Sequence, residues 1–115
     1  MKYILFFLTF VFIIFPSCSQ STSNDDNPTW VKAIIEKYEN NSNGNRPSIW
    51  RYEYKGITVY FVIAPCCDQA NILYDVNGNE ICSPSGGYFG NGDGRCPDFF
   101  QERKNEKLIW PVSGK

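Results

Sequence analysis

Cysteine is the residue type with the clearest capacity for chemistry in this 115-residue chain, which contains five cysteines and no histidine. Two of them, Cys66 and Cys67, are adjacent in the stretch VIAPCCDQA, and Cys82 and Cys96 follow. Structural zinc sites and thiol oxidoreductases both favour cysteines spaced as C-x-x-C. Because this spacing is absent, the sequence favours a structural role for the cysteines over a metal or redox site, and it predicts no cofactor.

The N-terminal residues indicate the compartment in which these cysteines reside. A positive charge at Lys2 precedes an apolar run over residues 4–15, and the small residue Ser17 follows. This order is typical of a secretory signal peptide, which we expect to occupy residues 1–17. The alternative is an uncleaved anchor, but a bilayer-spanning helix needs about 20 apolar residues, more than this run provides.

The stretch FPSC, which ends at Cys18, resembles the lipobox of bacterial lipoproteins, in which a cysteine receives a diacylglyceryl group on its sulfur. The resemblance implies lipidation of Cys18 and a membrane anchor, with a free secreted protein as the alternative. Residues 18–27 are polar and are predicted to be a tether. Ser19 and the pair Asp25-Asp26 resemble signals of lipoproteins sorted to the outer membrane or cell surface, so we expect a cell-envelope location.

The remaining chain suits one small domain over residues 28–115. Without residues 1–17 the chain has ten Lys and Arg (eleven less Lys2) against twelve Asp and Glu, a net charge of −2. No basic cluster could follow a phosphate backbone, so nucleic acid is excluded as a partner. So small a domain buries little apolar surface and benefits from covalent cross-links.

With Cys18 assigned to lipid, Cys66, Cys67, Cys82 and Cys96 are an even set in an oxidising compartment, which predicts two disulfides. Three connectivities are possible. A bond between Cys66 and Cys67 needs a strained ring, so we expect each of these neighbours to bond to a distant cysteine. The sequence does not choose between the two arrangements that satisfy this.

Hydrophobic periodicity predicts a small disulfide-stapled α+β domain. Apolar residues recur at helical spacing over residues 28–40, where Asn27-Pro28 resembles a cap followed by a first-turn proline. Residues 49–64 predict a hairpin that turns at Lys55-Gly56, and residues 71–82 predict a second hairpin that turns at Asn77-Gly78. We expect an amphipathic helix packed on an antiparallel sheet of two hairpins plus an edge strand.

The first hairpin also predicts which sheet face the helix covers. A two-residue turn pairs Tyr54 with Ile57 and places one apolar set on a single face. That set is Trp50, Tyr52, Tyr54, Ile57, Val59, Phe61 and Ile63. We expect the helix to lie on this face.

The remaining elements are shorter. Asp and Asn alternate over residues 75–79, a pattern found in calcium loops, but the EF-hand loop needs glycine at its sixth position, where this chain has Glu80. The turn is therefore favoured over a calcium site. Pro97-Asp98 predicts the start of a short helix that continues over residues 99–106, and residues 108–110 predict an edge strand that ends at Pro111.

A glycine-rich loop separates Cys82 from Cys96 and carries Tyr88 and Phe89 at its centre. It lacks the G-K-[ST] of a phosphate-binding loop and the spacing of a dinucleotide fingerprint. One interpretation makes the two aromatics an exposed contact for a partner. The other, which the sequence favours, folds one or both over the sheet as core.

Enzymatic activity is not expected. The absence of histidine removes Ser-His and Cys-His nucleophile pairs. Carboxylate chemistry remains, with Glu53, Asp68, Asp93 and Asp98 as the available groups, but no spacing brings any two of them together. The sequence therefore gives no catalytic residue.

Five motifs, in the order PCCDQ, LYDVNGNEIC, SGG, GDGRCPDF and LIW, resemble a family of small bacterial envelope proteins classed as a domain of unknown function. The resemblance implies an exported or lipid-anchored single domain and supplies no activity. We therefore expect a non-catalytic binding or interaction module whose partner is an envelope protein or a glycan. The alternatives are a structural lipoprotein without a dedicated ligand and, less favoured, a small carboxylate-dependent hydrolase.

Overall fold

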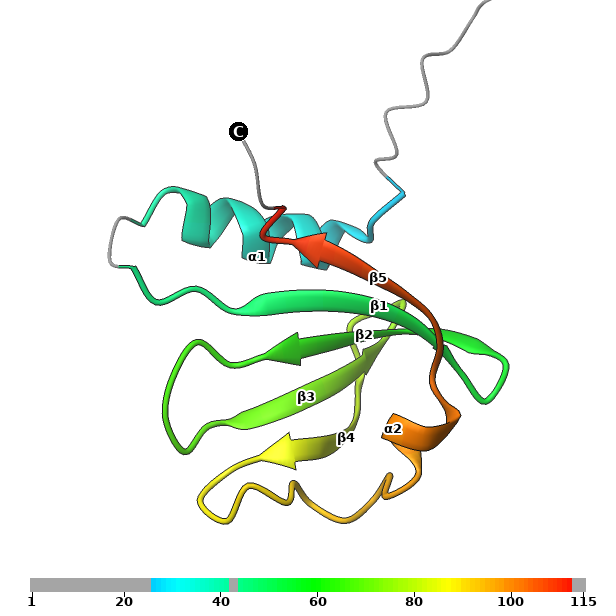
Figure 1. The fold of residues 1–115 in the computed structure, drawn as a ribbon. Helices are drawn as coiled ribbons and strands as arrows, with labels where there is room; N and C mark the ends of the chain where they lie inside the picture. Colours follow the sequence, from blue (N-terminus) through cyan, green and yellow to red (C-terminus); the bar gives the residue numbers. More distant parts are fainter. Residues whose placement is uncertain (1–25, 42–43, 113–115) are drawn as a thin grey trace, which may run out of the picture.

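The computed structural model describes residues 26–41 and 44–112, so the predictions for the signal peptide, for Cys18 and for most of the tether lie outside the described residues. The described chain is one α+β domain built on a five-stranded antiparallel sheet of order β4-β3-β2-β1-β5 (Figure 1). Its elements are α1 (Thr29–Glu39), β1 (Ser48–Tyr54), β2 (Ile57–Ile63), β3 (Ala70–Asp75), β4 (Glu80–Gly86), α2 (Phe99–Glu102) and β5 (Lys104–Trp110). The predicted fold class is confirmed.

The first hairpin forms with the predicted register. Tyr54 pairs with Ile57, and the pairing continues to Ser48 opposite Ile63. Lys55 and Gly56 both have positive φ, at 50° and 78°, as the two central residues of a tight hairpin turn require. The two-residue turn and the alternation of side chains between the two sheet faces thus specify the same β1–β2 register.

Helix α1 packs on the opposite face from the one predicted. Its buried residue Val31 contacts Ile49 and Tyr60, which point away from the Trp50 face, and Trp30 meets the Tyr60 ring edge-on with centroids 5.6 Å apart. The prediction failed because both faces of the hairpin are apolar over part of their length. The helix also begins differently: Pro28 is the N-cap and makes no side-chain cap, so the assignment of Asn27 as the cap is wrong.

The face predicted to lie under α1 is covered instead by the segment around α2. Phe99 is fully buried there, with its ring 5.5 Å from Tyr52, 5.4 Å from Tyr54 and 5.3 Å from Phe61. Arg103 closes this cluster, since its guanidinium lies 4.8 Å from the Tyr52 ring centroid and donates to the Tyr52 hydroxyl at 3.0 Å. The sheet therefore has a core on each face.

The second hairpin forms as predicted, but its turn lies one residue earlier: Gly78 donates to the Asp75 carbonyl at 3.1 Å, so Val76 and Asn77 are the central residues and Gly78, with positive φ, follows them. The Asp75 carboxylate accepts from the backbone N–H groups of Asn77 at 2.8 Å and Asn79 at 2.9 Å. Asp side chains often accept hydrogen bonds from backbone N–H groups two residues on, and such bonds stabilise turns. β5 pairs with β1 at the sheet edge, as predicted for residues 108–110. It begins earlier, at Lys104, so the predicted helix over residues 99–106 is wrong after Glu102, where α2 ends.

The two ends of the sheet carry different structures (Figure 1). Trp30 at the start of α1 donates from Nε1 to the Val76 carbonyl at 3.0 Å, so α1 starts beside the β3–β4 turn. The opposite end holds the β2–β3 turn and the loop after β4, because Ala70 pairs with Gly86. No helix within the described ranges is long and apolar enough to cross a bilayer.

Candidate functional site

Tyr88 and Phe89 are the most exposed large apolar residues that the structure describes. Their exposed fractions are 78% and 84%, and their rings contact each other edge-on at 5.0 Å. The favoured sequence interpretation, in which they fold over the sheet as core, is wrong. The core positions on both faces are already occupied by residues of α1 and the α2 segment. We call residues 86–92 the aromatic loop.

The backbone of the aromatic loop is held by hydrogen bonds around the aromatic pair. Gly90 donates to the carbonyl of Gly87 at 3.1 Å, which makes Tyr88 and Phe89 the central residues of a β-turn. Gly86 donates to the carbonyl of Gly90 and Gly92 to that of Gly86, each at 3.1 Å. The pair is thus presented on a closed, hydrogen-bonded tip.

Two glycines of the aromatic loop allow close backbone contacts that a side chain would prevent. Both Gly86 and Gly92 have positive φ. A Cβ on Gly92 would lie 2.0 Å from the Ser83 carbonyl oxygen, and one on Gly86 would lie 2.5 Å from that of Gln69. Only glycine fits at these two positions without a shift of the backbone.

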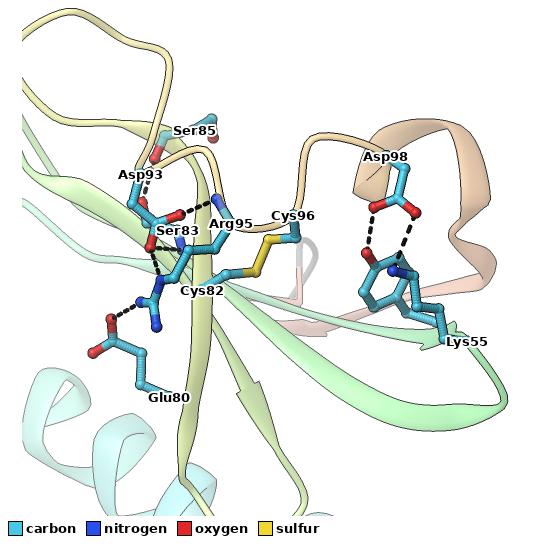
Figure 2. The surroundings of a disulfide bond; sticks show 10 residues. Lys55, Glu80, Cys82, Ser83, Ser85, Asp93, Arg95, Cys96 and Asp98 are labelled. Atoms are coloured by element: carbon cyan, nitrogen blue, oxygen red, sulfur yellow. Dashed lines mark hydrogen bonds and ion pairs between the residues drawn. A yellow bond between two sulfur atoms is a disulfide. The ribbon is translucent and has the colours of Figure 1, made fainter.

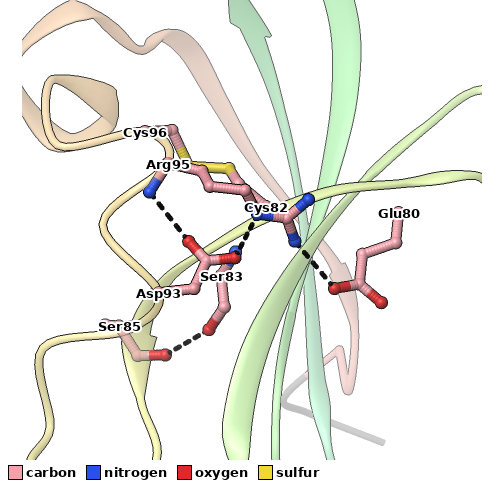
Figure 3. Close-up of polar contacts among 7 residues, drawn as sticks. All are labelled: Glu80, Cys82, Ser83, Ser85, Asp93, Arg95 and Cys96. Carbon is pink, nitrogen blue, oxygen red and sulfur yellow. Dashed lines mark hydrogen bonds and ion pairs between the residues drawn. A yellow bond between two sulfur atoms is a disulfide. The ribbon is translucent and has the colours of Figure 1, made fainter.

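Asp93 ties the aromatic loop to β4 (Figure 3). Its carboxylate accepts from the backbone N–H of Ser83 at 3.0 Å, from the backbone N–H of Arg95 at 3.0 Å and from Arg95 Nε at 2.6 Å. Arg95 also bonds Glu80 at 3.2 Å. These hydrogen bonds, that of the Arg95 backbone foremost, hold the pKa of Asp93 below its ordinary value.

The Cys82–Cys96 disulfide fastens the end of this segment to the core (Figure 2). Both cysteines are buried in the Phe99 cluster, with Cα atoms 6.2 Å apart. Two residues beyond Cys96, Asp98 accepts from the Tyr54 hydroxyl and pairs with Lys55 Nζ at 3.3 Å. The Tyr54 hydrogen bond is the main cause that lowers the pKa of Asp98.

Cys66 and Cys67 are bonded to each other, so the prediction that each reaches a distant cysteine is wrong. The reason is their place in the fold. They lie in the β2–β3 turn, whereas Cys82 stands opposite Leu73, three residues along β3 from the first residue of that strand. Three residues of strand span about 10 Å, beyond the Cα separation of about 7 Å that a disulfide bridges.

The β2–β3 turn and the aromatic loop are joined by backbone contact instead of by a disulfide. Gly87 donates to the Gln69 carbonyl at 3.0 Å. A cavity of about 250 Å³ opens between the two segments, bordered by Cys66, Cys67 and Gly87 among others. One end of the sheet thus carries the vicinal disulfide, this cavity and the exposed aromatic pair.

A larger groove of about 610 Å³ lies at the other end of the sheet, next to the start of α1. It is bordered by Arg51, Glu53 and the segment 26–28. Glu53 accepts from Asn105 Nδ2 at 2.9 Å, so its carboxylate joins β1 to the start of β5. We regard this groove as the place where the chain enters the domain.

The model of the domain of unknown function DUF6970 matches residues 36–112 of this chain. The chain belongs to this family. The DUF6970 match begins within α1 and includes all five strands, the vicinal cysteines and the aromatic loop. No curated protein and no solved structure shows significant similarity to the chain.

Membership of DUF6970 supplies no catalytic residue. Of the four carboxylates that the sequence offered for catalysis, three have structural partners. Glu53 bonds Asn105, Asp93 bonds Ser83 and Arg95, and Asp98 bonds Tyr54 and Lys55. Asp68 is exposed in the β2–β3 turn. Within residues 26–41 and 44–112, no group of three or more Cys, Asp or Glu side chains is placed to hold a metal ion.

Sequence reasoning found the aromatic pair but missed the residues that fix it in place. Gly86, Gly92 and Asp93 were available in the motifs SGG and GDGR, where an Asp between glycines is typical of a turn closed by its own side chain. The cavity beside the β2–β3 turn had no local signal, since it arises from the pairing of Ala70 with Gly86.

Acid is expected to destabilise the fold through Asp75, Asp93 and Asp98. Hydrogen bonds to the charged forms lower all three pKa values from an ordinary 3.8. A depressed folded-state pKa contributes stability that is complete above the unfolded value and is lost as pH falls through the folded value. Melting temperature should therefore hold from neutral pH to about pH 5 and fall below about pH 4. Asp93→Asn should lower the melting temperature at neutral pH and make its decrease in acid less steep. An equally steep decrease of the melting temperature in the variant would contradict this role for Asp93.

Proposed function

We propose that this protein is a cell-envelope lipoprotein whose domain is a non-catalytic binding module, with Tyr88 and Phe89 as its principal contact. The observation that carries the proposal is the exposure of both aromatic side chains on a loop whose backbone is closed by hydrogen bonds from Gly86, Gly90 and Gly92. Large apolar residues gathered on an exposed surface mark interaction sites. Aromatic residues are also the side chains that contribute most to binding energy at interfaces.

The rigidity of the aromatic loop supports binding over a purely structural role. Its tip is closed by the turn from Gly87 to Gly90, and its base is bonded to β4 through Asp93. A loop that is already ordered loses little conformational entropy when a partner binds. Since the two rings contribute nothing to either core cluster, this ordering does not serve the packing of the domain.

The position of the aromatic loop agrees with a membrane-anchored module. The described chain enters at the α1 end of the sheet, and the aromatic loop lies at the opposite end (Figure 1). β4 has seven residues, so these ends are about 20 Å apart. An N-terminal lipid anchor would therefore attach to the domain at the end opposite Tyr88 and Phe89.

The lipid anchor is tested by Cys18→Ser. Because the lipid is attached through the Cys18 sulfur, this change should release the protein from the membrane fraction or block its processing. Detergent phase separation of the variant and the unchanged protein measures the result. Equal partition of both proteins into the detergent phase, with equal electrophoretic mobility, would contradict the anchor.

The binding role is tested by replacing Tyr88 and Phe89 together with alanine. The double variant should lose at least about tenfold in affinity for its envelope partner, since two aromatic contacts exceed about 1.4 kcal/mol. Its melting temperature should stay unchanged because both rings are exposed. The measurement is capture from solubilised envelope on immobilised protein, followed by thermal unfolding of each variant.

A matched control is Ile57→Ala, which removes an exposed apolar residue at the other end of the sheet. The immobilised Ile57→Ala variant should capture the same envelope material as the unchanged protein. If the double variant captures the same material as the unchanged protein, the aromatic loop is not the contact and the structural-lipoprotein alternative stands.

A further inference from the structure

The cavity beside the aromatic loop has a lining that restricts the charge of a ligand. It lies between the β2–β3 turn and the base of the aromatic loop, and its border includes Cys66, Cys67, Asp68, Gln69 and Asn71. Among the described residues that line it, none is cationic and Asp68 is the one acidic residue. An anionic ligand would therefore find no counter-charge in this cavity.

The floor of the cavity is fixed by an amide whose hydrogen bonds are made within the protein. Asn71 Oδ1 accepts from the Ala64 backbone N–H at 2.9 Å, and Asn71 Nδ2 donates to Ser85 Oγ at 3.1 Å. These bonds hold the end of β2, β3 and β4 together. Gln69, by contrast, is exposed at the rim, where its amide has one acceptor and two donor hydrogens to offer a hydroxyl-rich ligand.

The apolar lining of the cavity comes from Ile63, Ala64 and the bonded pair Cys66 and Cys67. The Cys66–Cys67 disulfide presents a polarisable, uncharged surface to the cavity. Gly87 borders the cavity and is followed directly in the chain by Tyr88 and Phe89. A ligand that fits must therefore combine apolar faces with neutral hydrogen-bonding edges.

A folded protein partner fits this end of the sheet less well. A stable protein interface buries about 800 Å² on each partner and has an apolar centre. Two other exposed apolar residues lie at the opposite end of the sheet: Ile57 is the first residue of β2, and Val76 is in the β3–β4 turn. The cavity of about 250 Å³ is also below the usual size of a drug-sized pocket, so it admits one small ring.

We propose that the vicinal-disulfide turn and the aromatic loop together form a binding site for a neutral saccharide. A sugar ring has apolar C–H faces, which can stack on Tyr88 or Phe89, and peripheral hydroxyls, which can bond to Gln69 and to backbone groups of the cavity. One ring occupies the cavity and the rest of the glycan extends along the aromatic pair. This inference rests on the proposed function, because it names the ligand class of the same site.

The test is a nuclear magnetic resonance titration of the purified full chain in a detergent that contains no sugar. The probes are lactose, cellobiose and N,N′-diacetylchitobiose, with galacturonic acid as the anionic comparison and lysine methyl ester as the cationic one. At least one neutral disaccharide at about 10 mM, the range of weak single-ring contacts, should shift the backbone amides of residues 66–71 and 86–90. Gln69→Ala should weaken this binding about tenfold, whereas Ile57→Ala should leave it unchanged.

Three results would overturn the saccharide proposal: none of the neutral probes shifts these amides, a charged probe binds in preference, or Gln69→Ala binds as the unchanged protein does. Failure here is distinguishable from failure of the binding module itself. If Tyr88 and Phe89 are required for capture of envelope material while every saccharide is inert, the module binds another class of partner. Loss of that capture after protease treatment of the extract would then assign a protein.

Discussion

Phe99→Ala is expected to lower the free energy of unfolding by about 3–5 kcal/mol, most of the stability of so small a domain. Phe99 is fully buried and packs against Tyr52 and Tyr54 of β1 and Phe61 of β2. Truncation of Phe99 leaves a cavity under the α2 segment. The Cys82–Cys96 disulfide of the same cluster holds this segment in place, so it cannot move onto the sheet to fill the cavity. Chemical denaturation measures the loss.

Phe100→Ala is the matched control for this prediction. Phe100 is the next residue of α2 and contacts the rings of Phe61 and Phe99, but 45% of it is exposed. Its truncation should cost about 1 kcal/mol, in proportion to the smaller apolar area it buries. Equal losses for the two variants would show that the α2 segment is not the centre of this core.

Gly92→Ala is expected to destabilise the protein by about 2–4 kcal/mol, the sum of a left-handed backbone cost and an overpacking cost. The new Cβ would lie 2.0 Å from the Ser83 carbonyl oxygen and 2.7 Å from the Pro84 carbonyl carbon. Because these are backbone atoms of β4, the loop must move away from the strand. The movement would break the hydrogen bond from Asp93 N–H to the Ser83 carbonyl, which measures 2.9 Å.

Gly90→Ala isolates the backbone part of that cost. Gly90 also has positive φ, at 78°, but an added Cβ would meet nothing within 4 Å. It should lose only about 1 kcal/mol. Thermal unfolding of both variants gives the comparison, and a Gly90 variant as unstable as the Gly92 variant would contradict the close contact between the aromatic loop and β4.

The strand pairing could be predicted from sequence because two local signals agree. Lys55-Gly56 fixes the first turn, Gly78 marks the second to within one residue, and alternation fixes which residues share a face. The face covered by α1 could not be predicted in this way. The first hairpin carries aromatic or aliphatic residues on both faces, such as Tyr52 on one and Tyr60 on the other, so periodicity alone offers the helix two suitable surfaces.

The cysteine pairing and the exposure of the aromatic pair depend on tertiary distances that local sequence does not contain. Cys66 and Cys67 are separated from Cys82 by the length of β3 between the turn and Leu73, a distance set by strand register. Tyr88 and Phe89 are excluded from the core because Phe99 and α1 already fill the two faces. Their exposure follows from this competition and not from the composition of the loop itself.

The most direct test of the binding role is hydrogen exchange of the purified full chain, compared with and without solubilised envelope material. We expect slower amide exchange in peptides covering residues 66–71 and 86–92, because these segments form the proposed contact. Peptides from α1 and β5 should exchange at unchanged rates. Protection confined to α1, or no protection anywhere, would contradict the assignment of the aromatic loop as the binding surface.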